Sequence, residues 1–256
     1  MNHPFQWPDF LPAFELAAAN AGFSPVVLAD TPAGPLMAWI RPAVGPRIYL
    51  SAGIHGDEPA GPLALLELMT AGFFSSAIDW AICPALNPTG LAAGRRETAN
   101  GTDLNRDYLL VRTREVAAHA AWLGTRPSPN MFISLHEDWE TTGFYFYEIN
   151  LGADDPPRAQ GLIDAVRPWF APEPGPMIDD HLARGPGWIF HAAEADVPGG
   201  WPEAIFLAHH GCPLSFTFET PSHAALAARV GAHCAAVRAA SRSVGVSPTS
   251  YILANE

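Results

Sequence analysis

The sequence predicts an α/β fold in which a mixed, largely parallel central β-sheet is flanked by helices on both faces. Short β-rich runs alternate along the chain with longer runs rich in alanine and leucine, a pattern typical of strands and helices in such a sheet. The chain shows no internal repeat, charge block or linker. We therefore expect residues 1–256 to form a single domain.

Five short runs rich in apolar and β-branched residues are the predicted strands. They are Arg47 to Ser51, Trp80 to Leu86, Met131 to Leu135, Phe144 to Ile149 and Ser215 to Phe218. Five helices are predicted, the clearest from apolar residues that recur at helical spacing. They cover Leu11 to Ala21, a segment that begins near Pro59, Arg114 to Leu123, Arg158 to Phe170 and a long segment from Leu226 to Val237.

The stretch from Pro172 to Pro202 has a different character. It is rich in proline and glycine, carries interleaved aromatic residues and shows no period. Loops of this length are uncommon inside a compact domain and are often functional. The sequence therefore predicts a long loop that forms one wall of a site.

Composition excludes several classes of protein. A net charge of -12 with only 14 Lys and Arg residues argues against a nucleic-acid partner, because phosphate binding needs clustered basic side chains. The three cysteines are widely spaced and odd in number, which favours buried thiols over a disulfide framework or a catalytic cysteine. The chain has neither a signal-peptide pattern nor a run of about 18 apolar residues, so we expect a cytoplasmic protein without a membrane partner.

The first candidate residues follow the predicted strand Arg47 to Ser51. That strand runs into Ala-Gly-Ile-His-Gly-Asp-Glu-Pro, which places His55 and Glu58 where the strand gives way to a helix. A three-residue separation over a tight turn lets an imidazole and a carboxylate converge on one metal ion. Taken alone, however, the pair is more typical of hydrogen-bonded side chains at a surface.

A second strand end supplies a third candidate ligand. His136 follows the predicted strand Met131 to Leu135 in the run Ile-Ser-Leu-His-Glu-Asp. Two histidines and a glutamate are a known ligand set for catalytic zinc, and they leave a fourth position open. The two strand ends together suggest a zinc site.

The segment from Asn87 to Asp107 makes the pattern specific. The chain carries, in order, His-x-x-Glu, Asn-Pro-x-Gly, Arg, Asp-Leu-Asn-Arg, a strand that ends in His, and Phe-Glu-Thr. This order resembles the M14 zinc carboxypeptidases over roughly Ile48 to Thr220, and the conjunction is more specific than any one motif. The resemblance implies a zinc carboxypeptidase-like catalytic domain and a metallopeptidase-type hydrolase with one Zn²⁺ per chain.

The resemblance also implies the roles of the metal ligands and of the catalytic base. It assigns zinc binding to His55, Glu58 and His136. Glu219 in Thr-Phe-Glu-Thr matches the general base that activates the attacking water and passes a proton to the leaving amine.

Four further residues match the substrate-binding and supporting groups of the family. Asn105 and Arg106 match the anchors of a substrate carboxylate, which a guanidinium can bind with two hydrogen bonds. Arg96 matches the arginine that polarises the scissile carbonyl, with Arg95 as the alternative. Asp103 is expected to accept the second ring N–H of His55.

Several residues depart from the digestive type of carboxypeptidase. Asp57 stands where those enzymes carry arginine, and Glu137 and Asp138 follow His136. We expect these three carboxylates to form a rim that favours a substrate with a free amino or basic group. A second metal bound by these acids is the less favoured interpretation.

The tyrosine that usually covers the substrate has no clear match, because no tyrosine lies between Tyr147 and Tyr251. Trp188, His191 and Trp201 are candidates for that wall, although packing within the loop explains each of them more simply. Six further histidines match no motif and receive no site role. They are His119, His181, His209, His210, His223 and His233.

The leading hypothesis is hydrolysis of an amide bond next to a carboxylate, in a small peptide or an acylated amino acid. A His-Gly-x-Glu motif also occurs in the succinylglutamate desuccinylase and aspartoacylase branch, which cleaves acylated amino acids, and in murein-peptide amidases. The alternative of another class is a non-catalytic zinc- or peptide-binding protein on the same fold. Such a protein usually lacks a ligand or the base, and this sequence lacks neither.

Overall fold

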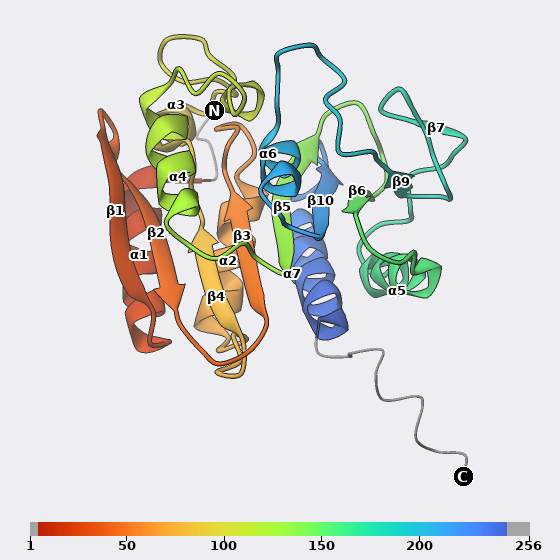
Figure 1. The fold of residues 1–256 in the computed structure, drawn as a ribbon, viewed down its shortest axis with the longest axis horizontal. Helices are drawn as coiled ribbons and strands as arrows, with labels where there is room; N and C mark the ends of the chain where they lie inside the picture. The colour runs from red at the N-terminus through yellow and green to blue at the C-terminus, as the bar shows by residue number, and fades with distance from the viewer. Residues whose placement is uncertain (1–4, 245–256) are drawn as a thin grey trace.

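The computed structural model describes residues 5–244 and contains one eight-stranded sheet with the strand order β1-β2-β4-β3-β5-β10-β6-β9 (Figure 1). The strands of this sheet are β1 (Ser24–Thr31), β2 (Gly34–Arg41), β3 (Arg47–Ala52), β4 (Asp79–Cys83), β5 (Met131–Asp138), β6 (Tyr145–Asn150), β9 (Trp188–Phe190) and β10 (Leu214–Pro221). The central strands β4, β3, β5 and β10 are parallel, whereas β1, β2 and β6 pair antiparallel to their inner neighbours. The sheet is therefore mixed, as expected.

Helices cover both faces of the sheet and create two separate cores. The helices are α1 (Trp7–Asn20), α2 (Ala60–Thr70), α3 (Pro88–Ala93), α4 (Arg114–Gly124), α5 (Pro156–Val166), α6 (Glu203–His209) and α7 (Leu226–Ser243). In Figure 1, α4 and α6 lie in front of the sheet and α1, α2 and α7 lie behind it. Successive side chains of β3 point to opposite faces of the sheet and so contribute to both cores. Ile48 and Leu50 pack behind the sheet, and Tyr49 packs in front of it.

The hairpin of β1 and β2 was not predicted. Both strands contain apolar runs, but each has a proline at its second position, Pro25 in β1 and Pro35 in β2, and proline within a run argues against a strand. The short helices α3 and α6 were also missed, because six or seven residues are too few to display a helical period. The five predicted helices are present, with bounds shifted by a few residues.

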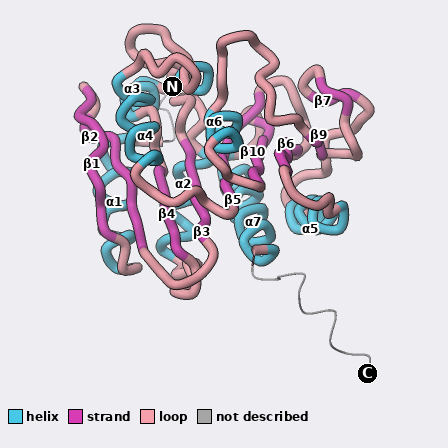
Figure 2. Tube along the Cα trace, in the orientation of Figure 1, coloured by secondary structure: helices cyan, strands magenta, loops and turns pink. Residues whose placement is uncertain are grey.

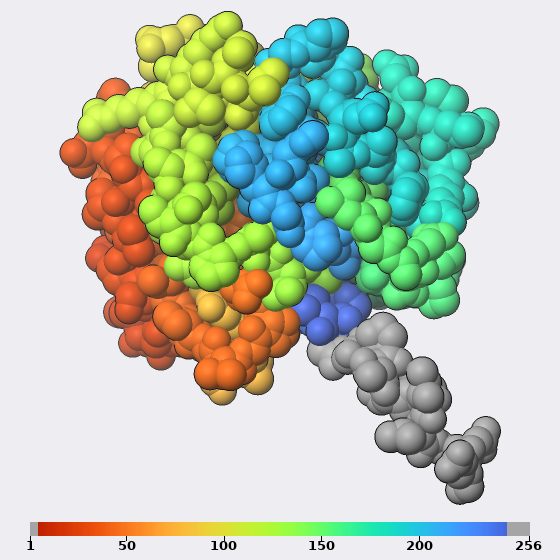
Figure 3. Space-filling model, in the orientation of Figure 1, coloured from red at the N-terminus to blue at the C-terminus, as the bar shows by residue number. Residues whose placement is uncertain are grey.

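The predicted loop from 172 to 202 is only partly irregular. It contains a small antiparallel pair, β7 (Met177–Ile178) with β8 (His181–Leu182), and β9, which extends the main sheet beside β6. Figure 2 shows how little regular structure the rest of this segment has, and in Figure 3 these teal residues form the upper right-hand end of the molecule. Within residues 5–244, no helix is long and apolar enough to cross a membrane.

Candidate active site

Neighbouring parallel strands bring the candidate residues to one edge of the sheet. The strand β5 continues to Asp138 and β10 to Pro221. His136 and Glu219 therefore lie within the last three residues of their strands, whereas the predicted strands ended before them. The register places Glu219 directly opposite His136. Because parallel strands share the direction of their carboxyl ends, residues from β3, β5 and β10 meet at this edge.

The turn between β3 and α2 carries His55 and Glu58 and depends on a close approach to α3. Gly56 lies so near this helix that a Cβ atom would fall 1.9 Å from the carbonyl carbon of Gly90. The Gly56 N–H also donates to the carbonyl oxygen of Arg96 at 3.3 Å. Glycine is required here because no side chain fits between the two segments.

His55, Glu58 and His136 are buried and point their polar atoms at one another. Nδ1 of His55 lies 2.6 Å from Oε1 of Glu58, and Nδ1 of His136 lies 3.1 Å from Oε2. One ligand atom from each residue can be chosen so that all three lie within 4.8 Å of one another. These three side chains, the triad from here on, thus converge as the ligands of a single ion do.

The electrostatics of the triad reflect tight coupling between these groups. Burial by itself lowers the pKa of His55, but Glu58 and Asp103 outweigh it and raise that pKa to about 9. Burial lowers the pKa of His136. Burial alone would raise the pKa of Glu58, yet the two imidazoles hold it below its usual range. The buried carboxylate therefore needs positive charge beside it.

The ligand atoms of the triad are of the kinds that bind zinc. Oε2 of Glu58 is buried and makes no hydrogen bond, although His136 lies beside it. A buried carboxylate oxygen without a donor is costly unless a cation or a further donor satisfies it. Two imidazole nitrogens and a carboxylate are ligands that zinc accepts.

Asp103 connects the triad to Arg96 and Asn105. Its Oδ1 lies 3.2 Å from Nε2 of His55 and accepts the N–H of Asn105 at 2.8 Å. Its Oδ2 accepts hydrogen bonds from Nε and Nη2 of Arg96 at 3.2 and 3.1 Å. The contact with His55 is the one that the sequence predicts, and it fixes the orientation of the ring.

The Asn-Pro-x-Gly motif supports Arg96. Asn87 caps α3 by accepting the N–H of Gly90, and its Nδ2 donates to the carbonyl oxygen of Arg96 at 3.2 Å. Nη1 of Arg96 lies 3.6 Å from Oε1 of Glu58, so the guanidinium borders the triad. Arg95 is exposed and does not line the pocket.

Asn105 and Arg106 lie beside the triad in a short 3-10 helix, Leu104–Arg106. Asn105 is buried, and its Oδ1 accepts the N–H of Glu203 at 3.0 Å, which directs its amide group. Arg106 is exposed and donates to the carbonyl oxygen of Asn105 at 2.9 Å. Both residues line the same pocket as Arg96.

Glu219 is half-buried between β5 and β6. Burial raises its pKa well above the usual range, and the neighbouring carboxylates Glu58 and Asp138 raise it further. A carboxylate with a raised pKa is a stronger base than an ordinary glutamate.

One pocket of about 630 Å³ is lined by the triad, Arg96, Asn105, Arg106 and Glu219. Its remaining wall is acidic and includes Asp57 and Asp138, as the sequence predicts. Glu137 also belongs to the lining of this pocket, but its carboxylate is buried, pairs with Arg229 of α7 and accepts the N–H of Ala60, so it offers no free charge to a rim. That ion pair joins the end of β5 to two helices instead of forming a rim.

Two tyrosines that the sequence analysis missed line this pocket. Tyr145 lies opposite Glu219 in the ladder, and its hydroxyl donates to Asp138 at 2.9 Å. Tyr147 follows on the same face, since the period of a strand is two residues. Trp188 is buried and Trp201 stacks on His209, and neither lines the pocket, whereas His191 does.

Comparison with known proteins places this geometry in a family context. The model of the succinylglutamate desuccinylase/aspartoacylase catalytic domain matches residues 44–119. The probable carboxypeptidase 2 of Arthroderma benhamiae is 32% identical over 101 residues, which cover 36% of this chain. The chain matches only 19% of the length of that relative.

Solved structures extend the likeness over nearly the whole chain. A Shewanella amazonensis protein proposed to be a metallopeptidase has a TM-score of 0.80 at 24% identity and covers 92% of each chain. A metallo-carboxypeptidase of Burkholderia cenocepacia has a TM-score of 0.71 at 17% identity, with 94% of this chain and 70% of that one covered. The predicted fold is thereby confirmed. The family match over residues 44–119 and the carboxypeptidase relatives support the predicted resemblance to M14-related proteins.

Proposed function

We propose that this chain is a zinc-dependent hydrolase that cleaves an amide bond next to a substrate carboxylate. The observation that carries the proposal is the convergence of His55, Glu58, His136 and Glu219 in one pocket that also contains basic anchors. In this proposal His55, Glu58 and His136 hold one zinc ion. When bound, the ion polarises the scissile carbonyl and lowers the pKa of a water molecule.

Two basic residues and one amide position the substrate in this proposal. Arg106 and the amide of Asn105 bind the carboxylate, since they line the pocket next to the triad. Arg96 borders both Glu58 and the open pocket, so it balances negative charge that develops on the carbonyl oxygen.

Glu219 supplies the proton transfers. It accepts a proton from the attacking water as the oxygen bonds to the carbonyl carbon. It then delivers that proton to the amide nitrogen as the C–N bond breaks, which gives a carboxylic acid and an amine; transfer of the acid's proton to the amine leaves a carboxylate and an ammonium group. The raised pKa of Glu219 suits both steps because the carboxyl group is protonated and deprotonated in turn.

A second candidate is deacylation of N-acyl amino acids. The observation that favours it is the match of residues 44–119 to the succinylglutamate desuccinylase/aspartoacylase catalytic domain. The chemistry and the residues are the same in both candidates, and only the substrate differs.

A substrate screen with the zinc-loaded protein tests the proposal and separates the candidates. The panel contains peptides with a free carboxyl terminus, the same peptides amidated at that end, muropeptides and N-acyl amino acids. We expect turnover only where a carboxylate lies next to the scissile amide. Equal turnover of free and amidated peptides contradicts the role of Asn105 and Arg106, and zinc binding without any turnover favours a binding protein.

A further inference from the structure

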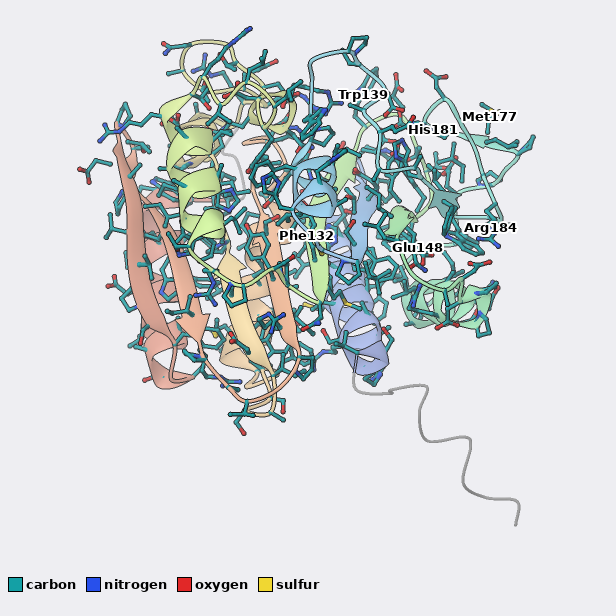
Figure 4. The ribbon with its side chains drawn as sticks, viewed as in Figure 1. Phe132, Trp139, Glu148, Met177, His181 and Arg184 are labelled. Atoms are coloured by element: carbon teal, nitrogen blue, oxygen red, sulfur yellow. The ribbon has the colours of Figure 1, made fainter. Side chains whose placement is uncertain are left out.

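A second cluster of metal-ligating side chains lies in the wall of the pocket, apart from the triad. It consists of His181 at the start of β8, His191 just after β9, and Asp196. Nε2 of His191 lies 3.2 Å from Oδ1 of Asp196, and Nε2 of His181 lies 3.7 Å from Oδ2. Figure 4 shows His181 in the loops at the upper end of the sheet, the end that also carries Trp139.

The hydrogen bond of His191 indicates which ring nitrogen is free. Nδ1 lies 2.5 Å from the carbonyl oxygen of Ala192, which can only accept, so Nδ1 carries the hydrogen. Nε2 is then the ring nitrogen left to face a metal ion, and it lies 3.2 Å from Oδ1 of Asp196. The same backbone bond is the usual outer support of a histidine ligand.

The charges around the cluster also call for a cation. Among the described residues, the two histidines are the ion-pair partners of Asp196, and no Lys or Arg reaches it. The nearby Arg184 pairs with Asp154 instead. Asp179, which binds the hydroxyl of Tyr147, adds a further negative charge to the same wall.

We propose that His181, His191 and Asp196 form a second metal site, for zinc or a similar divalent transition metal ion. Two imidazoles and a carboxylate suit such an ion better than calcium or magnesium, which prefer oxygen ligands. Ligand atoms on a tetrahedral zinc ion stand roughly 3.3 Å apart, given bonds of about 2.0 Å. The atoms of this cluster already lie within 4.8 Å of one another, so small side-chain rotations complete the site.

Contacts among aromatic rings hold the two histidines of this cluster close together. The rings of His181 and His191 lie edge to face with centroids 5.0 Å apart. Tyr147 contacts both rings, at 5.3 and 5.7 Å. An ion bound here links β8, the end of β9 and the segment that carries Asp196, and thus stiffens the wall that faces Glu219.

Zinc stoichiometry of the full chain tests the proposal without reference to turnover. The stripped protein is titrated with zinc and then freed of loosely bound metal by a chelating resin. We expect two equivalents in the wild type and one in the His55→Ala/His136→Ala variant, which lacks the triad. Adding His181→Ala and His191→Ala to that variant removes the remaining equivalent. His223→Ala, a change at an exposed histidine outside both clusters, leaves the count unchanged.

Asp196→Asn provides a second variant that preserves shape and packing. In the background without the triad, it weakens zinc binding at least tenfold and abolishes the rise in Tm that zinc produces. Circular dichroism verifies that each variant is folded. The proposal is overturned when the variant without the triad binds no zinc, or when the wild type and the His181→Ala/His191→Ala protein bind equal amounts. Because the two sites are removed separately, a failure of the triad to bind zinc remains distinguishable from a failure here.

Discussion

The two histidine clusters of this molecule face the same pocket but are held in different ways. His55, Glu58 and His136 are buried at the ends of β3 and β5, where the ladder and the core fix their backbones. In the second cluster, the histidines are half-buried and Asp196 is exposed, on segments with few ladder hydrogen bonds. Chemistry that requires fixed distances belongs on strand ends, whereas a loop wall can adapt to a substrate or an ion.

The largest expected effect is a loss of kcat when a group at a strand end is changed, compared with a matched change in the loop wall. Glu219→Gln removes the base but keeps the shape, so kcat falls by about 10²- to 10⁴-fold while bound zinc is retained. The measurement is kcat beside zinc content for the same preparation. The matched control is Glu194→Gln, at an exposed position in the loop wall outside the pocket lining. Turnover that survives in the Glu219→Gln protein refutes the proposed mechanism.

A smaller effect distinguishes the metal affinities of the two clusters. Asp103→Asn weakens the support of His55, so zinc affinity of the triad falls by about 10- to 100-fold. The affinity of the second equivalent stays constant, because Asp103 does not contact that cluster. Competition titration with a chelator measures both affinities, and Asp30→Asn on the exposed outer strand is the control. Equal weakening of both equivalents contradicts the separation of the sites.

The substrate anchor is expected to have a moderate effect. Arg106→Ala raises KM for substrates with a free carboxylate by about 10-fold. This is the lower end of the range expected for losing a hydrogen bond to a charged group, because Arg106 is exposed to solvent. KM for an amidated analogue changes little. Arg95→Ala is the control, since it removes the same charge from an exposed position outside the pocket. An equal rise in KM for both substrates shows that Arg106 does not bind the carboxylate.

The last effect concerns stability, rather than turnover or binding, on the rigid side of the pocket. Burial raises the pKa of Glu203 to about 7, and its carboxylate accepts hydrogen bonds from Tyr49 and Ser51. Between about pH 4.5 and 7 the folded state keeps a proton that the unfolded state releases, so stability falls as pH rises through this window. Glu203→Gln removes this slope.

The free energy of unfolding in urea, compared at about pH 5 and pH 7, measures this effect. The wild type loses about 1.4 kcal/mol per pH unit relative to Glu203→Gln. His119, whose pKa burial lowers to about 3, contributes an opposite slope, and its Nε2 lies 3.8 Å from Oε1 of Glu203, so the comparison reports the two groups together. Glu15→Gln, an exposed change on α1, should follow the wild type. Parallel pH profiles for wild type and Glu203→Gln contradict the assignment.

Local sequence accounts well for the inner strands and for the groups at their ends. The buried strands have continuous apolar runs, so β3 and β5 were placed within a few residues of their observed bounds. His55 and Glu58 are three residues apart, and one turn brings them together. The hairpin of β1 and β2 was not predicted, although both strands contain apolar runs, because a proline near the start of each strand argues against a strand.

The sequence by itself predicted the fold class and the resemblance to the M14 family, and it indicated the triad, Glu219 and the basic residues, because short motifs at strand ends carry that information. Only the tertiary structure showed that Glu137 pairs with Arg229, 92 residues away along the chain. It also decided that Tyr147 contacts His181 and His191 across the edge of the sheet. These contacts depend on how distant segments pack, and no local spacing encodes them.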